Sequence, residues 1–180
     1  LVALFFALYV GAEAGFGGWI YSYALNMNLD SNTGSAFLTS AFWGAITIGR
    51  FASIPLASRL RPMRILSMNL CGSLFAVSLM ILFSESRLVL WAGTILLGLF
   101  LASIFPTMLA FAGKRMPLTG NITRWFFVGA GAGGMFLPWL IGILFETISP
   151  RWTLLAIIMD LILAIIVFFW SSTYHKAHQT

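Results

Sequence analysis

The most regular feature of the sequence is the alternation of long apolar runs with short polar breaks. A helix needs about 20 consecutive apolar residues to cross a bilayer. Six runs have that length, at about 2–25, 36–58, 64–83, 88–112, 122–145 and 152–172. Within them, polar residues do not alternate with apolar ones as in the strands of a membrane β-barrel. The pattern predicts an all-α integral membrane protein with six transmembrane helices. The lipid bilayer is therefore an expected partner of the protein.

Composition agrees with this class. Hydrophobic residues make up 60% of the 180 residues and charged residues only 8%, whereas soluble domains carry about 25% charged residues. The chain starts at Leu1 and runs directly into the first apolar run, with no basic segment or cleavage site of a signal peptide. We therefore expect a piece of a longer protein, or one whose start has been lost.

Basic residues gather in every second polar break. They are Arg59, Arg61 and Arg64 in the second break and Lys114, Arg115 and Arg124 in the fourth, with Lys176 in the tail. Lys and Arg in short loops mark the cytoplasmic side of a membrane. We therefore expect residues 1–174 to form the membrane part and 175–180 a tail, with both termini cytoplasmic. This placement explains the net charge of +5 without a nucleic-acid partner.

Two points of cellular context follow from the same topology. The glycosylation sequon at residues 121–123 falls on the cytoplasmic side, where we expect it to stay unmodified. No signal for an organelle is visible, so the plasma membrane is the default location.

Three charged residues lie deep within apolar runs: Glu13, Arg50 and Asp160. Such residues cost about 2.5–3.5 kcal/mol each at a helix centre and usually face a bundle interior or an aqueous cavity. At about 1.5 Å per residue, Glu13 lies roughly 18 Å from the start of its span and Arg50 roughly 13 Å from Arg59. Their similar depth on consecutive spans makes them candidate partners.

These charges have two interpretations. Glu13 is a substrate or coupling-ion site with Arg50 beside it, or the two form a structural ion pair, with Arg50 alternatively extending to the interface. Asp160 is either functional or a protonated acid hydrogen-bonded to a neighbouring helix, and its role stays open.

Aromatic and small residues add to the candidate site. Tyr9 lies four residues before Glu13 and so on the same helical face, and Trp43, Phe105 and Trp125 are further deep aromatics. Aromatic rings can stack on the apolar faces of sugars, although packing or lipid contact also explains them. Gly-x-x-x-Gly pairs in the first and fifth runs predict close helix packing, and the prolines within runs permit kinks.

Catalysis is not expected. The histidines, His175 and His178, both lie in the tail, so no intramembrane Ser–His pair or His-based metal site can form. The sequence has no CxxC, phosphate-loop or HExxH motif. We expect no enzyme, no metal site and no cofactor other than H⁺ or Na⁺ as a coupling ion.

Three stretches carry a family resemblance: "YVGAEAGFGGWIYSYA", "AFWGAITIGRFASIPLASRL" and "LLGLFLASIFPTMLAFAGKRMP". They resemble the C-terminal half of the fucose permease-like branch of the major facilitator superfamily, which includes the sodium-dependent glucose transporter type. The resemblance implies one half of a twelve-helix fold, built from two inverted three-helix repeats, and a missing N-terminal six-helix half of the same chain.

The resemblance also implies a function. It is secondary active transport of a sugar or similar small polar solute by alternating access, coupled to H⁺ or Na⁺. Tyr9, Glu13, Trp43, Arg50, Phe105 and Trp125 become cavity candidates by helix, and Arg59, Arg61 and Arg64 represent the family's cytoplasmic gating loop. That loop's acid is replaced by Ser58. The alternatives are an uncoupled facilitator, or a non-transporting interaction or regulatory half-protein or fragment.

Overall fold

The computed structural model describes residues 1–174, and over that range the chain is helical with no β-strand. The helices are α1 (Val2–Asn26), α2 (Asn32–Arg59), α3 (Pro62–Leu82), α4 (Arg87–Leu101), α5 (Ile104–Gly113), α6 (Gly120–Thr147) and α7 (Trp152–Tyr174). α4 and α5 follow one another within a single apolar segment and together form one span. The described residues therefore contain six helical segments that are long and apolar enough to cross a membrane. The predicted six-helix fold class is confirmed, and the predicted tail lies outside the described residues.

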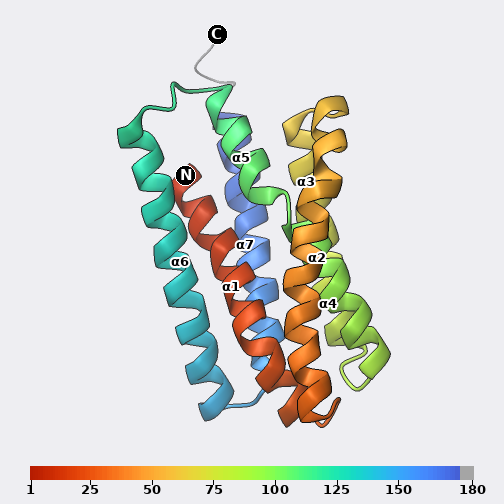
Figure 1. Ribbon diagram of the computed structural model, residues 1–180. Coiled ribbons are helices and arrows are strands. Elements are labelled where there is room, and N and C mark those ends of the chain that lie inside the picture. Colours follow the sequence, from red (N-terminus) through yellow and green to blue (C-terminus); the bar gives the residue numbers. More distant parts are fainter. Residues whose placement is uncertain (175–180) are drawn as a thin grey trace.

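The helices stand roughly side by side, and the direction of the chain alternates from one span to the next, with α4 and α5 forming a single span (Figure 1). The start of α1, the α2–α3 and α5–α6 connections and the end of α7 all lie at one end of the bundle (Figure 1). We call this the basic end, because it carries the two Arg-rich loops. The α1–α2, α3–α4 and α6–α7 connections lie at the opposite end (Figure 1).

Short polar sequences start the helices. The Ser31 hydroxyl accepts a hydrogen bond from the Gly34 amide at the start of α2, and the Ser86 hydroxyl accepts one from the Val89 amide at the start of α4. Pro62 opens α3, where its fixed φ suits a first helical residue. These residues start α2, α3 and α4 in the polar segments that separate the spans.

α1 is the central helix, and its small residues let α6 approach closely. A Cβ on Gly133 would collide with the Ala7 carbonyl oxygen, and one on Gly129 would collide with that of Ala3. Gly11 faces the same contact, where a Cβ would lie 3.2 Å from the Gly133 carbonyl oxygen. The close packing predicted from the Gly-x-x-x-Gly pairs is therefore confirmed for α1 and α6.

The fourth span is broken at Ala102–Ser103, between α4 and α5. Pro106 lies in the first turn of α5, three residues after Ser103, and has no N–H to bond the Ala102 carbonyl four residues earlier. A buried side-chain hydrogen bond supports the irregular backbone, because Asn69 Nδ2 of α3 donates to Ser103 Oγ at 2.6 Å. By contrast, α2 and α6 run through Pro55 and Pro138 without interruption.

Candidate functional site

The centre of the candidate site is a polar pair on α1. The Tyr9 ring is completely buried, and its hydroxyl donates a hydrogen bond to Glu13 Oε2 one helical turn away. The Glu13 side chain is only 12% exposed. The predicted shared face of Tyr9 and Glu13 thus becomes a direct hydrogen bond within the bundle.

Arg50 reaches this pair from α2. Its Nη2 lies 3.8 Å from Glu13 Oε1, while 56% of the Arg50 side chain stays exposed. Close helix packing sets this position, because a Cβ on Gly49 would lie 2.6 Å from Ala102 Cβ of the break and 3.0 Å from the Leu99 carbonyl oxygen. The predicted pairing of Glu13 with Arg50 is confirmed as an ion pair, although its function stays a prediction.

The broken span adds a backbone acceptor. The Tyr9 hydroxyl oxygen lies 3.3 Å from the carbonyl oxygen of Leu101, the last residue of α4. A hydroxyl has one proton to donate, so Glu13 and Leu101 offer two alternative acceptors for it. Phe105 of α5 completes this side of the site, with its ring centroid 6.4 Å from that of Tyr9.

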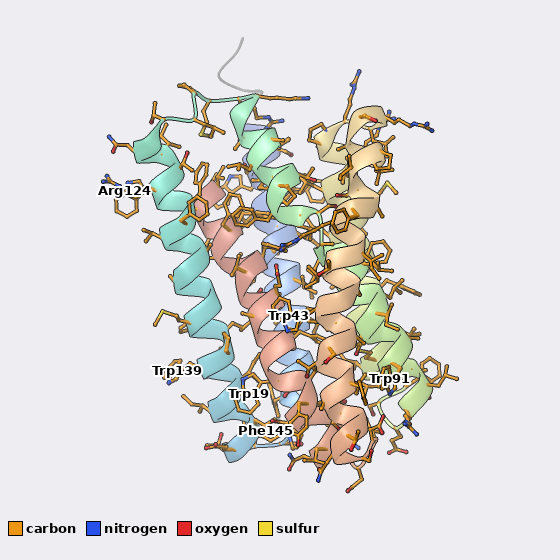
Figure 2. The ribbon with its side chains drawn as sticks, viewed as in Figure 1. Trp19, Trp43, Trp91, Arg124, Trp139 and Phe145 are labelled. Atoms are coloured by element: carbon orange, nitrogen blue, oxygen red, sulfur yellow. The ribbon has the colours of Figure 1, made fainter. Side chains whose placement is uncertain are left out.

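The two candidate tryptophans lie in different places. Trp43 of α2 is 44% exposed and packs against α1 at Gly17, where a Cβ would lie 2.7 Å from its indole. Gly17 is one turn from Glu13, so Trp43 borders the polar cluster, and Figure 2 shows it midway along the bundle. Trp125 of α6 is 61% exposed and lies beside Arg124, near the basic end, in a 6.0 Å cation–π contact.

The three candidate gating arginines gather at the basic end. Arg59 closes α2, Arg61 precedes α3 and Arg64 lies in its first turn. All three side chains are exposed, and none forms an ion pair with an acid in residues 1–174. The structure therefore separates them from Glu13, and their gating role stays a prediction.

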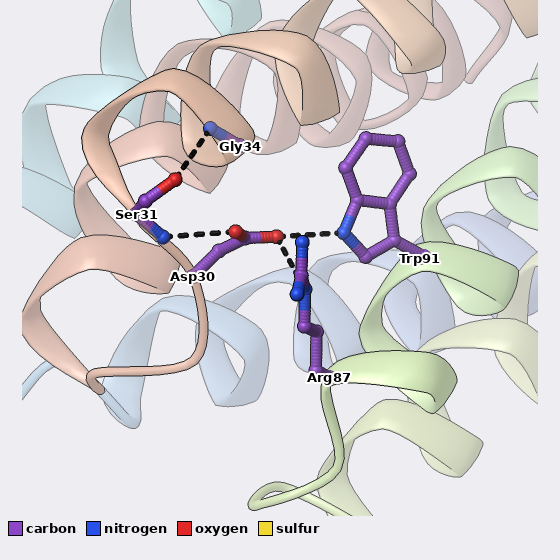
Figure 3. Close-up of polar contacts among 5 residues, drawn as sticks. All are labelled: Asp30, Ser31, Gly34, Arg87 and Trp91. Atoms are coloured by element: carbon purple, nitrogen blue, oxygen red, sulfur yellow. Dashed lines mark hydrogen bonds and ion pairs between the residues drawn. The ribbon is translucent and has the colours of Figure 1, made fainter.

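A second polar cluster, which sequence reasoning missed, lies at the end opposite the basic end (Figure 1), and Figure 3 shows its contacts. Asp30 Oδ2 accepts hydrogen bonds from Arg87 Nε at 2.9 Å and from Trp91 Nε1 at 2.8 Å. Asp30 Oδ1 accepts one from the Ser31 amide at 2.8 Å, and Gly34 leaves the room that this carboxylate occupies. The Trp91 hydrogen bond, followed by those of Ser31 and Arg87, holds the pKa of Asp30 below its ordinary value.

Sequence reasoning singled out neither Asp30 nor Trp91 as a candidate. The available signal was an acid immediately before a Ser–Asn helix start, where a carboxylate can accept from an unsatisfied backbone amide. Its partners on α4 lie 57 and 61 residues away. No local pattern in the sequence links positions so far apart.

Asp160 of α7 lies apart from both clusters. Only 8% of the Asp160 surface is exposed. Its Oδ2 is buried and has no hydrogen-bond partner in the described residues. The alternative that this acid hydrogen-bonds to a neighbouring helix is therefore wrong for Oδ2, because the walls around it are apolar.

Six apolar helical segments around a buried polar cluster define an integral, multi-pass membrane protein of the helical class. No protein-family model matches the sequence. Among curated proteins, it is 36% identical over 169 residues to "Major facilitator superfamily domain-containing protein 4A" of Mus musculus, covering 93% of this chain and 33% of that protein. It is 40% identical over 134 residues to the protein of the same name from Danio rerio, covering 73% and 25%.

One further curated relative and one solved structure are also similar to this chain. "Sodium-dependent glucose transporter 1A" of Mus musculus is 35% identical over 144 residues, covering 80% of this chain and 34% of that protein. Among solved structures, an auto-inhibited peptide transporter of the POT family shares the fold, with a TM-score of 0.85, 14% identity and coverage of 96% of this chain and 36% of that one. The chain belongs to the major facilitator superfamily. It spans about a third of the length of these curated relatives.

Proposed function

We propose that this chain forms part of a secondary active transporter that moves a sugar or similar small polar solute by alternating access. The observation that carries the proposal is the Tyr9–Glu13–Arg50 cluster beside the break in the fourth span. Buried carboxylates near broken helices are typical of substrate and ion sites in transporters. The similarity to sodium-dependent glucose transporters supports both a sugar substrate and ion coupling.

The cluster suggests how an ion would act on the protein. When Glu13 is ionised, it accepts the Tyr9 proton and faces the Arg50 guanidinium. When Glu13 binds a proton, its own O–H can donate to the Tyr9 oxygen, and the Tyr9 proton can turn to the Leu101 carbonyl. Protonation of Glu13 would thus change the hydrogen bonding of the Leu101 carbonyl at the broken span. Na⁺ would compete with Arg50 for the same carboxylate oxygens.

The solute would lie against the exposed part of this cluster. The Arg50 side chain keeps more than half of its surface open and offers donors for hydroxyl groups. Trp43 of α2 supplies an exposed aromatic face beside Gly17, which lies one turn along α1 from Glu13. In this proposal Phe105 shapes the buried wall of the site, Trp125 contacts the solute on its way to the basic end, and Arg59, Arg61 and Arg64 control the closure of that end.

The test uses the full-length protein in proteoliposomes, with labelled hexose uptake measured under a pH gradient, a sodium gradient and no gradient. Glu13→Gln keeps the size of the side chain and removes its charge. We expect the variant to lose accumulation against a gradient and to keep exchange of hexose across the membrane. Glu146→Gln, at an exposed acid near the end of α6, is the matched control and should behave as wild type.

Other outcomes separate the alternatives. Loss of both accumulation and exchange in a folded variant assigns Glu13 to solute binding. Wild-type protein that equilibrates hexose but never accumulates it is an uncoupled facilitator. Wild-type protein that moves no hexose overturns the sugar assignment, and Glu13→Gln protein that accumulates hexose normally overturns the coupling role.

A further inference from the structure

An apolar groove of about 640 Å³ runs between α1, α6 and α7. Its walls include Ala7 and Leu8 of α1, Ala132 and Phe136 of α6, and Ala156 and Met159 of α7. The volume is within the range of small-molecule sites, which are mostly apolar with a few polar groups that fix orientation. Asp160 is the one ionisable residue among the residues that line the groove.

The groove is separate from the candidate transport site. At 3.6 residues per turn, Leu4, Ala7 and Leu8 lie on the opposite face of α1 from Tyr9 and Glu13. The groove therefore borders the outer side of α1, while the polar cluster faces α2 and the broken span. A ligand in one site would not touch the other.

Asp160 has no hydrogen-bond or ion-pair partner among residues 1–174. It is 92% buried, since only 8% of its surface is exposed, and its Oδ2 receives no hydrogen bond. No Lys, Arg or His in the part of the chain that the structure describes forms an ion pair with it. It lies about 12 Å along α7 from Trp152, which is well inside the apolar segment. A polar group at such depth is costly unless it is paired.

A molecule that occupies the groove can supply this partner. The apolar walls call for an apolar body, and the unpaired carboxylate calls for a donor that also brings positive charge. We propose that the groove binds a lipophilic amine, with its ammonium group on Asp160 and its hydrocarbon chain along α6 and α7. A neutral alcohol supplies a donor without the charge and should bind more weakly. Ordinary phospholipid chains supply neither.

The test uses photo-crosslinking of the full-length protein in phosphatidylcholine nanodiscs. The probes are hexadecylamine and hexadecanol, each carrying a diazirine at the same position of the chain. Labelled peptides are identified by mass spectrometry. We expect the amine to label α6 and α7 residues of the groove at least about tenfold more than the alcohol does, in line with a charge-assisted hydrogen bond.

Three variants sharpen the result. Asp160→Asn should reduce amine labelling about tenfold and leave alcohol labelling unchanged. Ala132→Phe fills the groove and should reduce labelling while Asp160 is retained, which keeps the test valid if Asp160→Asn fails to fold. Met135→Phe is the control on α6, because Met135 is 78% exposed and does not line the groove.

Equal labelling by amine and alcohol in wild-type protein would overturn the proposal and assign the groove to ordinary lipid. Unchanged amine labelling in folded Asp160→Asn protein would do the same, as would labelling that Ala132→Phe does not reduce. These outcomes are independent of hexose uptake, so failure here is distinguishable from failure of the proposed transport function.

Discussion

Asp30 accepts hydrogen bonds from three donors on two parts of the chain, its neighbour Ser31 and the α4 residues Arg87 and Trp91. The Arg87 side chain is 65% exposed, whereas only 2% of the Asp30 side chain is exposed. The carboxylate is therefore covered by its donors. At this end of the bundle the cluster fastens the α1–α2 connection to α4, and a nearby contact of 3.8 Å between Glu85 and Arg151 joins two exposed side chains.

Titration of Asp30 should appear in the stability of the protein. Its pKa is lower in the folded protein than the ordinary value of 3.8, chiefly because of the Trp91 hydrogen bond. The stabilisation is therefore fully present above pH 3.8 and is lost as the pH falls through the lower folded pKa. We expect wild type to unfold at a higher temperature than Asp30→Asn at neutral pH, with the difference shrinking in acid.

The measurement is the thermal midpoint of both proteins in detergent across that pH range. Glu85→Gln is the control, because Glu85 is 87% exposed and its loss should change little at any pH. A wild-type advantage over Asp30→Asn that stays constant down to the lowest pH would show that the charge of Asp30 is not what stabilises the cluster.

Between elements, contact depends on which residues lack a side chain. Gly133 and Gly131 lie two residues apart on α6, yet a Cβ on Gly133 would collide with α1, and one on Gly131 would have nothing within 4 Å. We expect Gly133→Ala to push α1 and α6 apart and to cost about 1–3 kcal/mol, as overpacking does. Gly131→Ala should be neutral or slightly stabilising, because alanine favours helix.

Thermal unfolding of the two variants, followed by fluorescence-detected size exclusion, compares these positions directly. Equal effects at both positions would mean that general loss of helix flexibility, and not the α1–α6 contact, decides the outcome.

A buried hydrogen bond from Asn69 to Ser103 lies at the break in the fourth span. Ser103→Ala would leave Asn69 Nδ2 without its acceptor, and an unsatisfied buried donor costs about 1–3 kcal/mol. We expect a lowered thermal midpoint for this variant. Ser53→Ala is the control, because Ser53 is a helical serine of α2 that bonds only to its own helix, at the Arg50 carbonyl. A midpoint unchanged by Ser103→Ala would mean that a water or backbone group replaces the serine.

Sequence reasoning predicted the spans well because the apolar runs and their breaks are long, local signals. It also found the Glu13–Arg50 pair, since equal depth on consecutive spans requires only the helical rise. It did not find which proline breaks a helix. Pro55, Pro106 and Pro138 look alike in sequence, but in residues 1–174 only the Pro106 region lies beside a buried hydrogen bond between side chains of two spans, from Asn69 to Ser103.

The same limit applies to Trp125. Its position in an apolar run predicts a place in the cavity, and this stays a prediction, because the rotation of α6 sets which way Trp125 points. That rotation follows from the contact of Gly129 and Gly133 with α1, which is tertiary information. Trp19 illustrates the same contact, since its indole N–H donates to the Pro138 carbonyl across the two helices at 2.9 Å.

For the whole molecule, the arrangement of the two ends makes a topology test possible. The Arg-rich loops and both described chain ends share one end of the bundle (Figure 1), and the positive-inside rule predicts that this end is cytoplasmic. In a Cys71→Ser background, a cysteine at Glu85 should react with an impermeant maleimide in intact cells. A cysteine at Arg61 should react only after permeabilisation. The reverse pattern would invert the predicted orientation.

The contact between α1 and α6 also determines when the protein can finish folding. Its two sides, Ala7 and Gly133, lie 126 residues apart in the sequence. At about 5–20 residues per second, the ribosome needs on the order of 6 to 25 s to reach the second after making the first. During that interval the small-residue face of α1 is uncovered in the membrane. Membrane chaperones and quality-control proteases could therefore bind the uncovered face of α1 until α6 is made and packs against it.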